Sequence, residues 1–306
     1  MSSAARLRFF DIGANLTDPV FRGVYRGKQK HPSDFAQILQ RARDAGVERM
    51  MVTGTNLADS KEAVEMAKQN EGITCTVGCH PTRCKEFLDD PEAYYKSLQA
   101  LIEENRSVVV AVGETGLDYD RLQFCPKDVQ ATYFKRQIDL AEATQLPMFL
   151  HLRNAHDDFL HIMEPNRHRI VGGVVHSYDG PLDVALRLIE MGFYIGLNGC
   201  SLRKEENLDV VKHLPTDKLM LETDCPWCEV RPSHAGFQYV KTKVQAKKAD
   251  KWEDGKYVKS RNEPALITQV LEIVSGCKGE DPEVVAEHAF TNAQRMFGGG
   301  GGGGDK

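Results

Sequence analysis

The run Val108-Val-Val-Ala-Val-Gly-Glu114 is apolar and largely β-branched until it ends on a carboxylate. Short runs of this kind are typical of strands buried in a parallel sheet. Three further runs also end on a residue that can bind a metal, namely Met148-Phe-Leu-His151, Gly173-Val-Val-His176 and Leu219-Met-Leu-Glu-Thr-Asp224. The sequence therefore predicts parallel strands that finish on metal ligands.

Eight strands of this type are predicted along the chain. The first four cover residues 7–11, 50–53, 74–77 and 108–112, and the others begin near Met148, Gly173, Tyr194 and Leu219. Amphipathic stretches between them predict helices over residues 34–45, 60–69, 92–105, 127–144 and 182–191. Gly46 and Gly192 follow two of these helices, where a left-handed residue is favoured. The alternation predicts an α/β protein, a (β/α)8 TIM barrel in a single domain.

The barrel is predicted to occupy residues 1–297 of the 306-residue chain. A polar insertion over about residues 225–262 follows the last predicted strand and is expected to lie over the active rim. A closing helix is predicted to open at Pro282. Residues 298–306 are mostly glycine and are expected to form a flexible tail, because they have no apolar side chains to pack.

The composition, 41% hydrophobic and 27% charged, is that of an ordinary globular protein. No apolar stretch reaches the roughly 18 residues of a membrane span, and the first residues lack the apolar core of a secretory signal. We therefore expect an intracellular protein with no membrane partner. A monomer is predicted, although no sequence feature decides the oligomeric state. Its eight cysteines are expected to be free thiols. The spacing of Cys225 and Cys228 would suit redox chemistry or half a zinc site, but an ordinary loop is favoured because no second such pair follows.

The charge distribution bears on possible partners. The formal net charge of −5 argues against nonspecific coating of nucleic acid. However, the segment 241–261 contains eight basic residues against three acidic ones, a local charge of +5. Such a segment suits a polyanionic substrate, with a solvated surface loop as an equal alternative. Trp252, Tyr257 and Tyr239 lie among these lysines and would either stack on bases or anchor the loop.

The four ligand-type residues are far apart in sequence but follow strands. The carboxyl ends of barrel strands meet at one rim, where active sites of such barrels lie. We therefore expect the side chains of four residues to converge there: Glu114, His151, His176 and Asp224. Two imidazoles and two carboxylates at one point predict a site for a divalent metal.

Several neighbouring residues are further candidates for the site. His80 follows the third predicted strand, and the adjacent Pro81 predicts a fixed loop. Arg153 is suited to a bidentate contact with phosphate, although a helix-capping ion pair is an equal alternative. Asp118 is predicted either to support a ligand or to be an ordinary turn residue. Asp224 is preferred to Glu222 as a ligand or proton acceptor, since it lies nearer the rim.

Motifs along nearly the whole chain resemble those of the TatD family of metal-dependent deoxyribonucleases, which belong to the amidohydrolase-type barrels. The resemblance rests on Phe10-Asp-Ile-Gly-Ala-Asn-Leu16, Gly54-Thr-Asn56, Gly78-Cys-His-Pro81, Gly113-Glu-Thr-Gly-Leu-Asp118, His151-Leu-Arg153, His176-Ser-Tyr, Glu222-Thr-Asp224-Cys-Pro-Trp and Arg261-Asn-Glu-Pro264. The loop Ser233-His-Ala-Gly236 and the lysine-rich insertion resemble the eukaryotic branch. This branch implies nuclear or cytoplasmic residence.

The resemblance also implies an activity and roles for individual residues. It implies hydrolysis of DNA phosphodiesters, as a 3′-5′ exonuclease, with endonuclease activity as the alternative that the sequence leaves open. Glu114 is implied as a bridging ligand, and His151, His176 and Asp224 as further ligands. The catalytic residues are then expected to be Asp224, Glu114 and His80.

The expected cofactor is Mg²⁺, in one or two ions per chain, although two imidazoles alone would favour Mn²⁺ or Zn²⁺. Many family members carry a His-x-His pair where this chain has Gly13 and Asn15. Asn15 offers only a neutral oxygen, so a second ion would be weakly bound or absent. Contacts to DNA are predicted for Arg153, Asn15 and Arg261.

Two other functions compete with the nuclease. The first is hydrolysis of a small ester, amide or phosphoester by the same type of barrel. Related enzymes of that kind commonly place a modified lysine on the fourth strand, where this chain has Glu114, which favours the nuclease. The second is a noncatalytic protein that binds nucleic acid.

Overall fold

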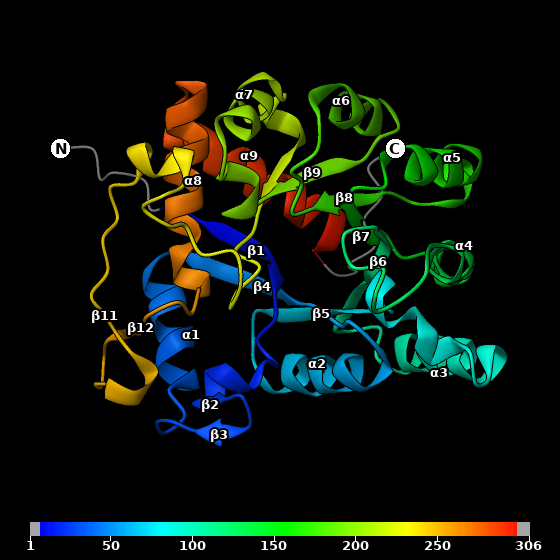
Figure 1. Ribbon diagram of the computed structural model, residues 1–306, viewed down its shortest axis with the longest axis horizontal. Helices are drawn as coiled ribbons and strands as arrows, with labels where there is room; N and C mark the ends of the chain where they lie inside the picture. The colour runs from blue at the N-terminus through cyan, green and yellow to red at the C-terminus, as the bar shows by residue number, and fades with distance from the viewer. Residues whose placement is uncertain (1–6, 299–306) are drawn as a thin grey trace. The chain divides into compact units, whose positions relative to one another are not determined.

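All eight predicted strands are present in the computed structural model, which describes residues 7–298 (Figure 1). They form one sheet whose order follows the chain, and every pairing that is resolved in it is parallel. This is the topology of a (β/α)8 barrel, as predicted. The strands are β1 (Phe9–Ala14), β4 (Val47–Val52), β5 (Ile73–Val77), β6 (Val109–Asp118), β7 (Met148–Arg153), β8 (Gly173–His176), β9 (Tyr194–Leu197) and β10 (Leu219–Leu221).

Helices alternate with these strands, and the predicted helices are confirmed to within a few residues. Gly46 and Gly192 adopt φ values of 94° and 84°, as expected after helix C-termini. No bounds were predicted for helices α5, α7 and α8. The helices are α1 (Phe35–Asp44), α2 (Leu57–Gln69), α3 (Pro91–Glu104), α4 (Lys127–Thr144), α5 (His156–Asn166), α6 (Leu182–Glu190), α7 (Glu205–His213), α8 (Ile267–Lys278) and α9 (Pro282–Phe297).

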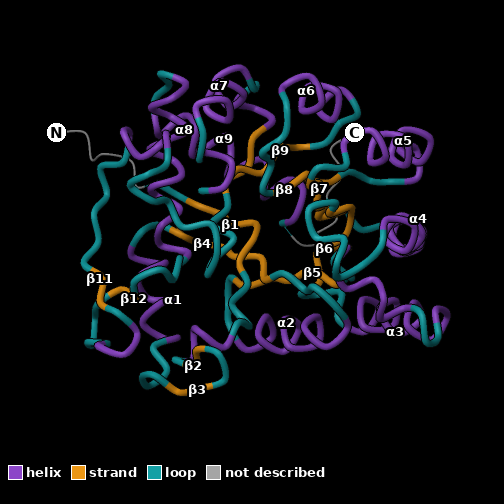
Figure 2. Tube along the Cα trace, viewed as in Figure 1, coloured by secondary structure: helices purple, strands orange, loops and turns teal. Residues whose placement is uncertain are grey.

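The described residues divide into two compact units. The first unit contains residues 7–52 and 174–292, in which β1 pairs with β4 and β9 pairs with both β8 and β10. A parallel bridge between Ala14 and Cys225 joins the ends of β1 and the loop after β10, so the first and last strands of the sheet meet. The second unit contains residues 53–173 and 293–298 with the sheet β5-β6-β7, and α2 runs alongside β5 (Figure 2).

The predicted polar insertion carries little regular structure. It contains a short 3₁₀ helix, Ala235–Tyr239, and the two-residue strands β11 (Ala246–Lys247) and β12 (Tyr257–Val258). Its predicted bounds and those of the barrel domain remain predictions. The predicted tail lies outside the described residues except for Gly298. No helix within residues 7–298 combines the length and apolar character of a bilayer-crossing segment.

Two buried glutamines of α4 fix the backbone beside the candidate site in the second unit. Gln137 accepts from the Cys79 N–H at 2.7 Å and donates to the Cys79 carbonyl at 2.9 Å. Gln130 makes the same pair of contacts with Asp118, at 2.8 and 2.9 Å. The two glutamines are seven residues apart and therefore share one face of the helix. One helix face thus positions both the residue before His80 and the end of β6.

A buried ion cluster connects α1 with the end of the insertion in the first unit. The Arg261 guanidinium donates to both carboxylate oxygens of Asp34, at 2.8 and 2.5 Å, and to Glu263 at 2.9 Å. Arg261 is only 2% exposed, and both carboxylates are equally buried. The two Nη atoms are therefore occupied by protein carboxylates. The contact with DNA predicted for Arg261 stays a prediction that this geometry does not support.

Replacing Arg261 by methionine should destabilise the protein. The change leaves the buried Asp34 without its bidentate partner and Glu263 with Arg41 alone, and breaking a buried ion pair typically costs about 3–5 kcal/mol. Urea unfolding followed by circular dichroism measures the effect. The matched control is Arg187→Met, because Arg187 forms an exposed pair with Glu190 and should change stability by at most about 1 kcal/mol. Equal unfolding midpoints for the two variants would contradict the structural role of Arg261.

Candidate metal centre

Strand β6 carries the central carboxylate of the candidate site. The strand was predicted to end at Val112, but it continues to Asp118, so Glu114 lies within it. An irregularity in the pairing with β7 lies between Val112 and Thr115, after which Gly116 pairs with His151. The early end was predicted because glycines usually interrupt strands. Here they allow the strand to continue beside its neighbour.

Two glycines permit this close approach of β6 to β7. Gly113 and Gly116 have φ values of 156° and 141°, in a region that residues with side chains rarely adopt. A Cβ atom would lie 2.4 Å from the Phe149 carbonyl oxygen at Gly113 and 2.0 Å from that of His151 at Gly116. Neither position therefore tolerates a side chain without a backbone shift. The glycines bring Glu114 against the histidine of β7.

The Glu114 carboxylate faces two imidazoles. Its Oε1 atom lies 2.7 Å from His151 Nδ1 and 3.4 Å from His80 Nε2. The three side chains are buried, with 6 to 8% of each residue exposed. One potential ligand atom from each lies within 4.8 Å of the others. The prediction that His80 joins Glu114 and His151 in one cluster agrees with this arrangement.

His80 presents an N–H group to the carboxylate. The Thr82 backbone N–H donates to His80 Nδ1 at 3.1 Å, at the start of the 3₁₀ helix Pro81–Phe87. A nitrogen that accepts a hydrogen bond from an N–H carries a lone pair, so this network assigns the proton of the neutral ring to Nε2. His80 therefore has the geometry of a proton donor toward Glu114.

Asp118 lies behind His151. Its Oδ2 atom is 3.3 Å from His151 Nε2, so both nitrogens of this ring face carboxylates. Burial alone would raise the pKa of Asp118, but the hydrogen bond and charge of His151, with help from His80 and Arg121, hold that pKa below its usual value. A carboxylate behind a ligating histidine fixes the orientation of the ring and leaves the other nitrogen to the metal. The structure thus favours a supporting role for Asp118.

The donor atoms of this cluster fit a divalent ion. Ligand atoms about 2.0–2.2 Å from an ion lie about 3.0–3.4 Å from one another. Nε2 of His80 carries the ring proton, so the ligand atoms are Glu114 Oε1 and His151 Nδ1, whose separation of 2.7 Å is a hydrogen-bond distance. An ion between His151 and Glu114 would therefore replace the shared proton and separate the two atoms by a few tenths of an ångström.

A second carboxylate and histidine pair lies in the first unit. His176, at the end of β8, is 3.3 Å from Glu222 Oε2 through Nδ1. Glu222 is completely buried, and its Oε1 accepts from the Ser177 backbone N–H at 2.6 Å and from the Asn198 amide at 3.0 Å. These contacts orient the carboxylate toward Nδ1 of His176, and the role of His176 as a ligand, through Nε2, stays a prediction. Asp224 was predicted as the ligand in preference to Glu222, and the contact of Glu222 with His176 was not predicted.

Asp224 is held by backbone and side-chain contacts after β10. It adopts a φ of 53°, and its N–H donates to the Gly13 carbonyl at 2.7 Å. The Asn15 amide donates to Asp224 Oδ1 at 2.9 Å and to the Cys225 carbonyl at 3.1 Å. Asn15 was predicted to contact the substrate. Its amide group instead orients Asp224, and a contact between its oxygen and DNA stays a prediction.

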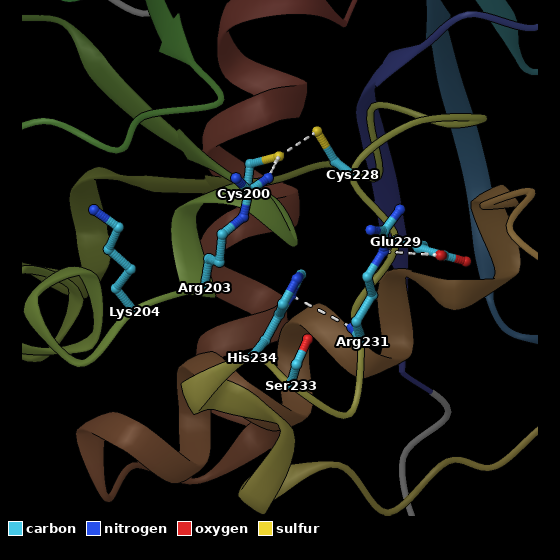
Figure 3. A pocket seen from close by; sticks show the side chains of 8 residues that line it. All are labelled: Cys200, Arg203, Lys204, Cys228, Glu229, Arg231, Ser233 and His234. Atoms are coloured by element: carbon cyan, nitrogen blue, oxygen red, sulfur yellow. Dashed lines mark hydrogen bonds and ion pairs between the residues drawn. The ribbon is translucent and has the colours of Figure 1, made fainter.

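Cys225 and Cys228, the closely spaced cysteine pair of the sequence, lie in different surroundings. Cys225 is fully buried, whereas Cys228 donates to Asp224 Oδ2 at 3.2 Å and lies 2.8 Å from Cys200, sulfur to sulfur. All eight cysteines are free thiols, as expected. Cys200 and Cys228 line a pocket with a volume of about 480 Å³. The Arg203 guanidinium donates to the Cys200 sulfur at 3.2 Å, and Figure 3 shows these side chains together.

Arg153 completes the predicted set. It is the last residue of β7, pairs with Asp118 in the sheet and is half-buried. Its predicted contact with phosphate stays a prediction. The structure thus gathers His80, Glu114, Asp118 and His151 in the second unit. In the first unit it gathers His176 with Glu222 and Asp224 with Asn15.

Comparison with known proteins places this chain in a family. The profile described as "TatD related DNase" matches residues 10–298. "Deoxyribonuclease Tat-D" of Schizosaccharomyces pombe is 48% identical over 95% of this chain and 96% of its own length. "3′-5′ ssDNA/RNA exonuclease TatD" of Citrobacter rodentium is 32% identical over 94% of this chain and 97% of its own length.

A solved structure supports the assignment independently. The crystal structure described as a hydrolase TatD family protein from Entamoeba histolytica superposes with a TM-score of 0.90 at 36% identity, over 96% of this chain and 99% of the other. The match in fold covers the strands and helices that carry the candidate site. The chain therefore belongs to the TatD-related DNase family of hydrolases.

Proposed function

We propose that this chain is a metal-dependent deoxyribonuclease that hydrolyses phosphodiester bonds of DNA. The observation that carries the proposal is the buried Glu114 carboxylate between His80 and His151, at 3.4 and 2.7 Å. Membership of the family and a relative named as a deoxyribonuclease at 48% identity support it. DNA is thus the expected partner, bound by a monomer in the nucleus or cytoplasm.

The proposed direction of cleavage is 3′-5′ from a strand end, with endonuclease activity as an alternative. A relative of 32% identity is named as a 3′-5′ exonuclease on single-stranded DNA and RNA, which favours the exonuclease. The two modes give different products. An exonuclease releases mononucleotides from a labelled strand, whereas an endonuclease produces internal fragments.

We propose Mg²⁺ as the working ion, with Mn²⁺ and Zn²⁺ as alternatives that imidazole ligands favour. Glu114 and His151 would hold it, and His176 and Asp224 as further ligands stay predictions. A bound divalent ion supplies Lewis acidity to water and phosphate oxygens. One tightly held ion is proposed rather than two, because Gly13 and Asn15 lack imidazoles.

The protein side chains have separable roles in the proposed reaction. Asp118 holds the His151 ring in place through Nε2. Asp224, oriented by Asn15, would accept a proton from the attacking water. His80 carries its proton on Nε2 and would stabilise the leaving oxygen with a hydrogen bond from that N–H. Arg153 is proposed to hold a backbone phosphate.

Replacing Glu114 by glutamine should lower metal-dependent DNA cleavage by more than about 100-fold, because a neutral amide removes the charge that holds the cation. The assay uses metal-stripped protein, end-labelled single- and double-stranded DNA, and added Mg²⁺, Mn²⁺ or Zn²⁺. Glu104→Gln is the matched control, since Glu104 is exposed on α3. Cleavage by the Glu114 variant at the parent rate would refute the proposed site.

The same assay separates the two alternative functions. Folded parent protein that binds DNA without cleaving it would favour the noncatalytic nucleic-acid-binding protein. Parent protein that cleaves small esters but not DNA would favour the small-molecule hydrolase.

Glutamine at position 222 should weaken metal binding by about 10- to 100-fold. The Ser177 and Asn198 donors keep the oxygen of the new side chain in the place of Oε1. Its NH₂ group would then face His176 Nδ1 and force the ring proton onto Nε2, which removes the ligand atom. Competition with a chromophoric chelator gives the affinity, and Glu190→Gln on α6 is the exposed control. An affinity within twofold of the parent would show that His176 does not bind the ion.

A further inference from the structure

An open cavity of about 910 Å³ in the first unit has no part in the proposed chemistry. It lies between the hairpin of β2 (Val24–Tyr25) and β3 (Lys28–Gln29) and the loop that follows Asp224. Its volume is that of a ligand site, for which about 300–1,000 Å³ is usual. The hairpin contributes three cations to the lining, and the loop contributes Trp227.

Trp227 exposes an indole on a fixed backbone. The residue is 57% exposed, although its N–H donates to the Asp224 carbonyl at 3.0 Å and its own carbonyl accepts from the Asn262 amide at 2.8 Å. Tryptophan is enriched at binding surfaces, because its ring offers a large apolar face and a polar N–H. Because the carbonyl of Asp224 is one of its anchors, the ring lies close in sequence and space to a predicted catalytic residue.

The other tryptophan of the chain differs. Trp252 was one of the aromatic residues that could stack on bases, but its ring stacks on His31 with centroids 5.4 Å apart and an angle of 6° between the planes. Tyr257, in the same segment, lies under the Arg41 guanidinium at 4.8 Å. These rings anchor the insertion, which leaves Trp227 as the better candidate for stacking.

The hairpin supplies positive charge opposite the indole. Its two-residue loop, Arg26 and Gly27, has φ values of 50° and 73°, as in the type I′ turns that join two strands tightly. Arg26, Lys28 and Lys30 are exposed, and none forms an ion pair with another residue in the range 7–298. The acidic residue in the lining, Asp18, accepts from the Val20 N–H at 2.9 Å. The cavity wall is therefore cationic.

We propose that this cavity binds a segment of single-stranded DNA, with a base stacked on Trp227 and the neighbouring phosphates on Arg26, Lys28 and Lys30. Stacking and phosphate contacts of this type are how proteins hold single strands without reading their sequence. A duplex keeps its bases stacked internally, so only an unpaired base can cover the indole. The proposal rests on the proposed deoxyribonuclease function and assigns the residues of this chain that hold an unpaired strand.

The fluorescence of Trp227 tests the proposal directly, because the chain has only two tryptophans. Trp252→Phe leaves Trp227 as the only emitter and keeps an aromatic ring on His31. The Trp252→Phe protein is titrated with oligothymidylate in EDTA, and the same titration is repeated with Mg²⁺ in a variant that also carries Glu114→Gln. In both titrations the emission of Trp227 should fall and then reach a plateau. A separate anisotropy titration with labelled oligonucleotide measures the affinity.

Variants then separate the two contacts. Trp227→Ala should weaken binding by roughly 5- to 150-fold, the range of a single stacked base. The triple variant Arg26→Glu, Lys28→Glu and Lys30→Glu should weaken it further and reduce the slope of log affinity against log salt by about 0.7 for each lost phosphate contact. Phe124→Ala and Lys61→Glu are the matched controls, since both side chains are exposed in the second unit.

The outcomes distinguish this proposal from the proposed function. DNA binding without quenching of Trp227, or no binding in either condition, would overturn the proposal. Unchanged affinity in both the tryptophan and the triple variant would overturn it as well, while DNA cleavage by the parent could still stand. A third outcome is a protein that never cleaves DNA although its Trp227 emission is quenched by DNA and its variants bind DNA more weakly. This outcome would support the binding site and refute the nuclease. Duplex DNA should quench the emission far less than the single strand at the same concentration.

Discussion

The candidate site depends on one interaction, the contact of the buried Glu114 carboxylate with the His151 imidazole. Glu114 is 6% exposed, and an ionised group in that position is unfavourable unless opposite charge or hydrogen-bond donors compensate it. His151 and His80 supply that compensation, and each is fixed in turn by a further contact, with Asp118 and with Thr82. The glycines of β6 and the glutamines of α4 place these groups, so the fold around the site serves one electrostatic requirement.

The same principle operates in the first unit with other residues. Glu222 is completely buried and is compensated by two N–H donors and by His176. Asp224 is only half-buried and receives the Asn15 amide. A carboxylate that is fully enclosed is suited to orienting a neighbour, whereas one that reaches solvent is suited to exchanging a proton with water. Burial therefore separates the roles of two carboxylates that lie two residues apart.

The sequence was sufficient for the fold because strand and helix patterns are local. The runs that end at His151 and His176 were visible as apolar segments, and Gly46 and Gly192 marked helix ends. The length of β6 was not visible, because Gly113 and Gly116 look like strand breakers until the neighbouring strand is in place. The pairings of Glu222 with His176, of Asn15 with Asp224 and of Arg261 with Asp34 join segments more than 40 residues apart, and no local pattern specifies such partners. The aromatic residues of the insertion illustrate the same limit, since only the structure shows which rings are covered.

The central claim is that a divalent ion binds at Glu114 and His151. Anomalous diffraction from crystals soaked in Mn²⁺ measures this most directly, because it locates the ion without an activity assay. The account predicts an anomalous peak about 2.0–2.3 Å from a Glu114 carboxylate oxygen and from His151 Nδ1, with Asp118 still behind the His151 ring. A fully occupied peak elsewhere in the molecule, with the Glu114 and His151 atoms still 2.7 Å apart, would contradict it.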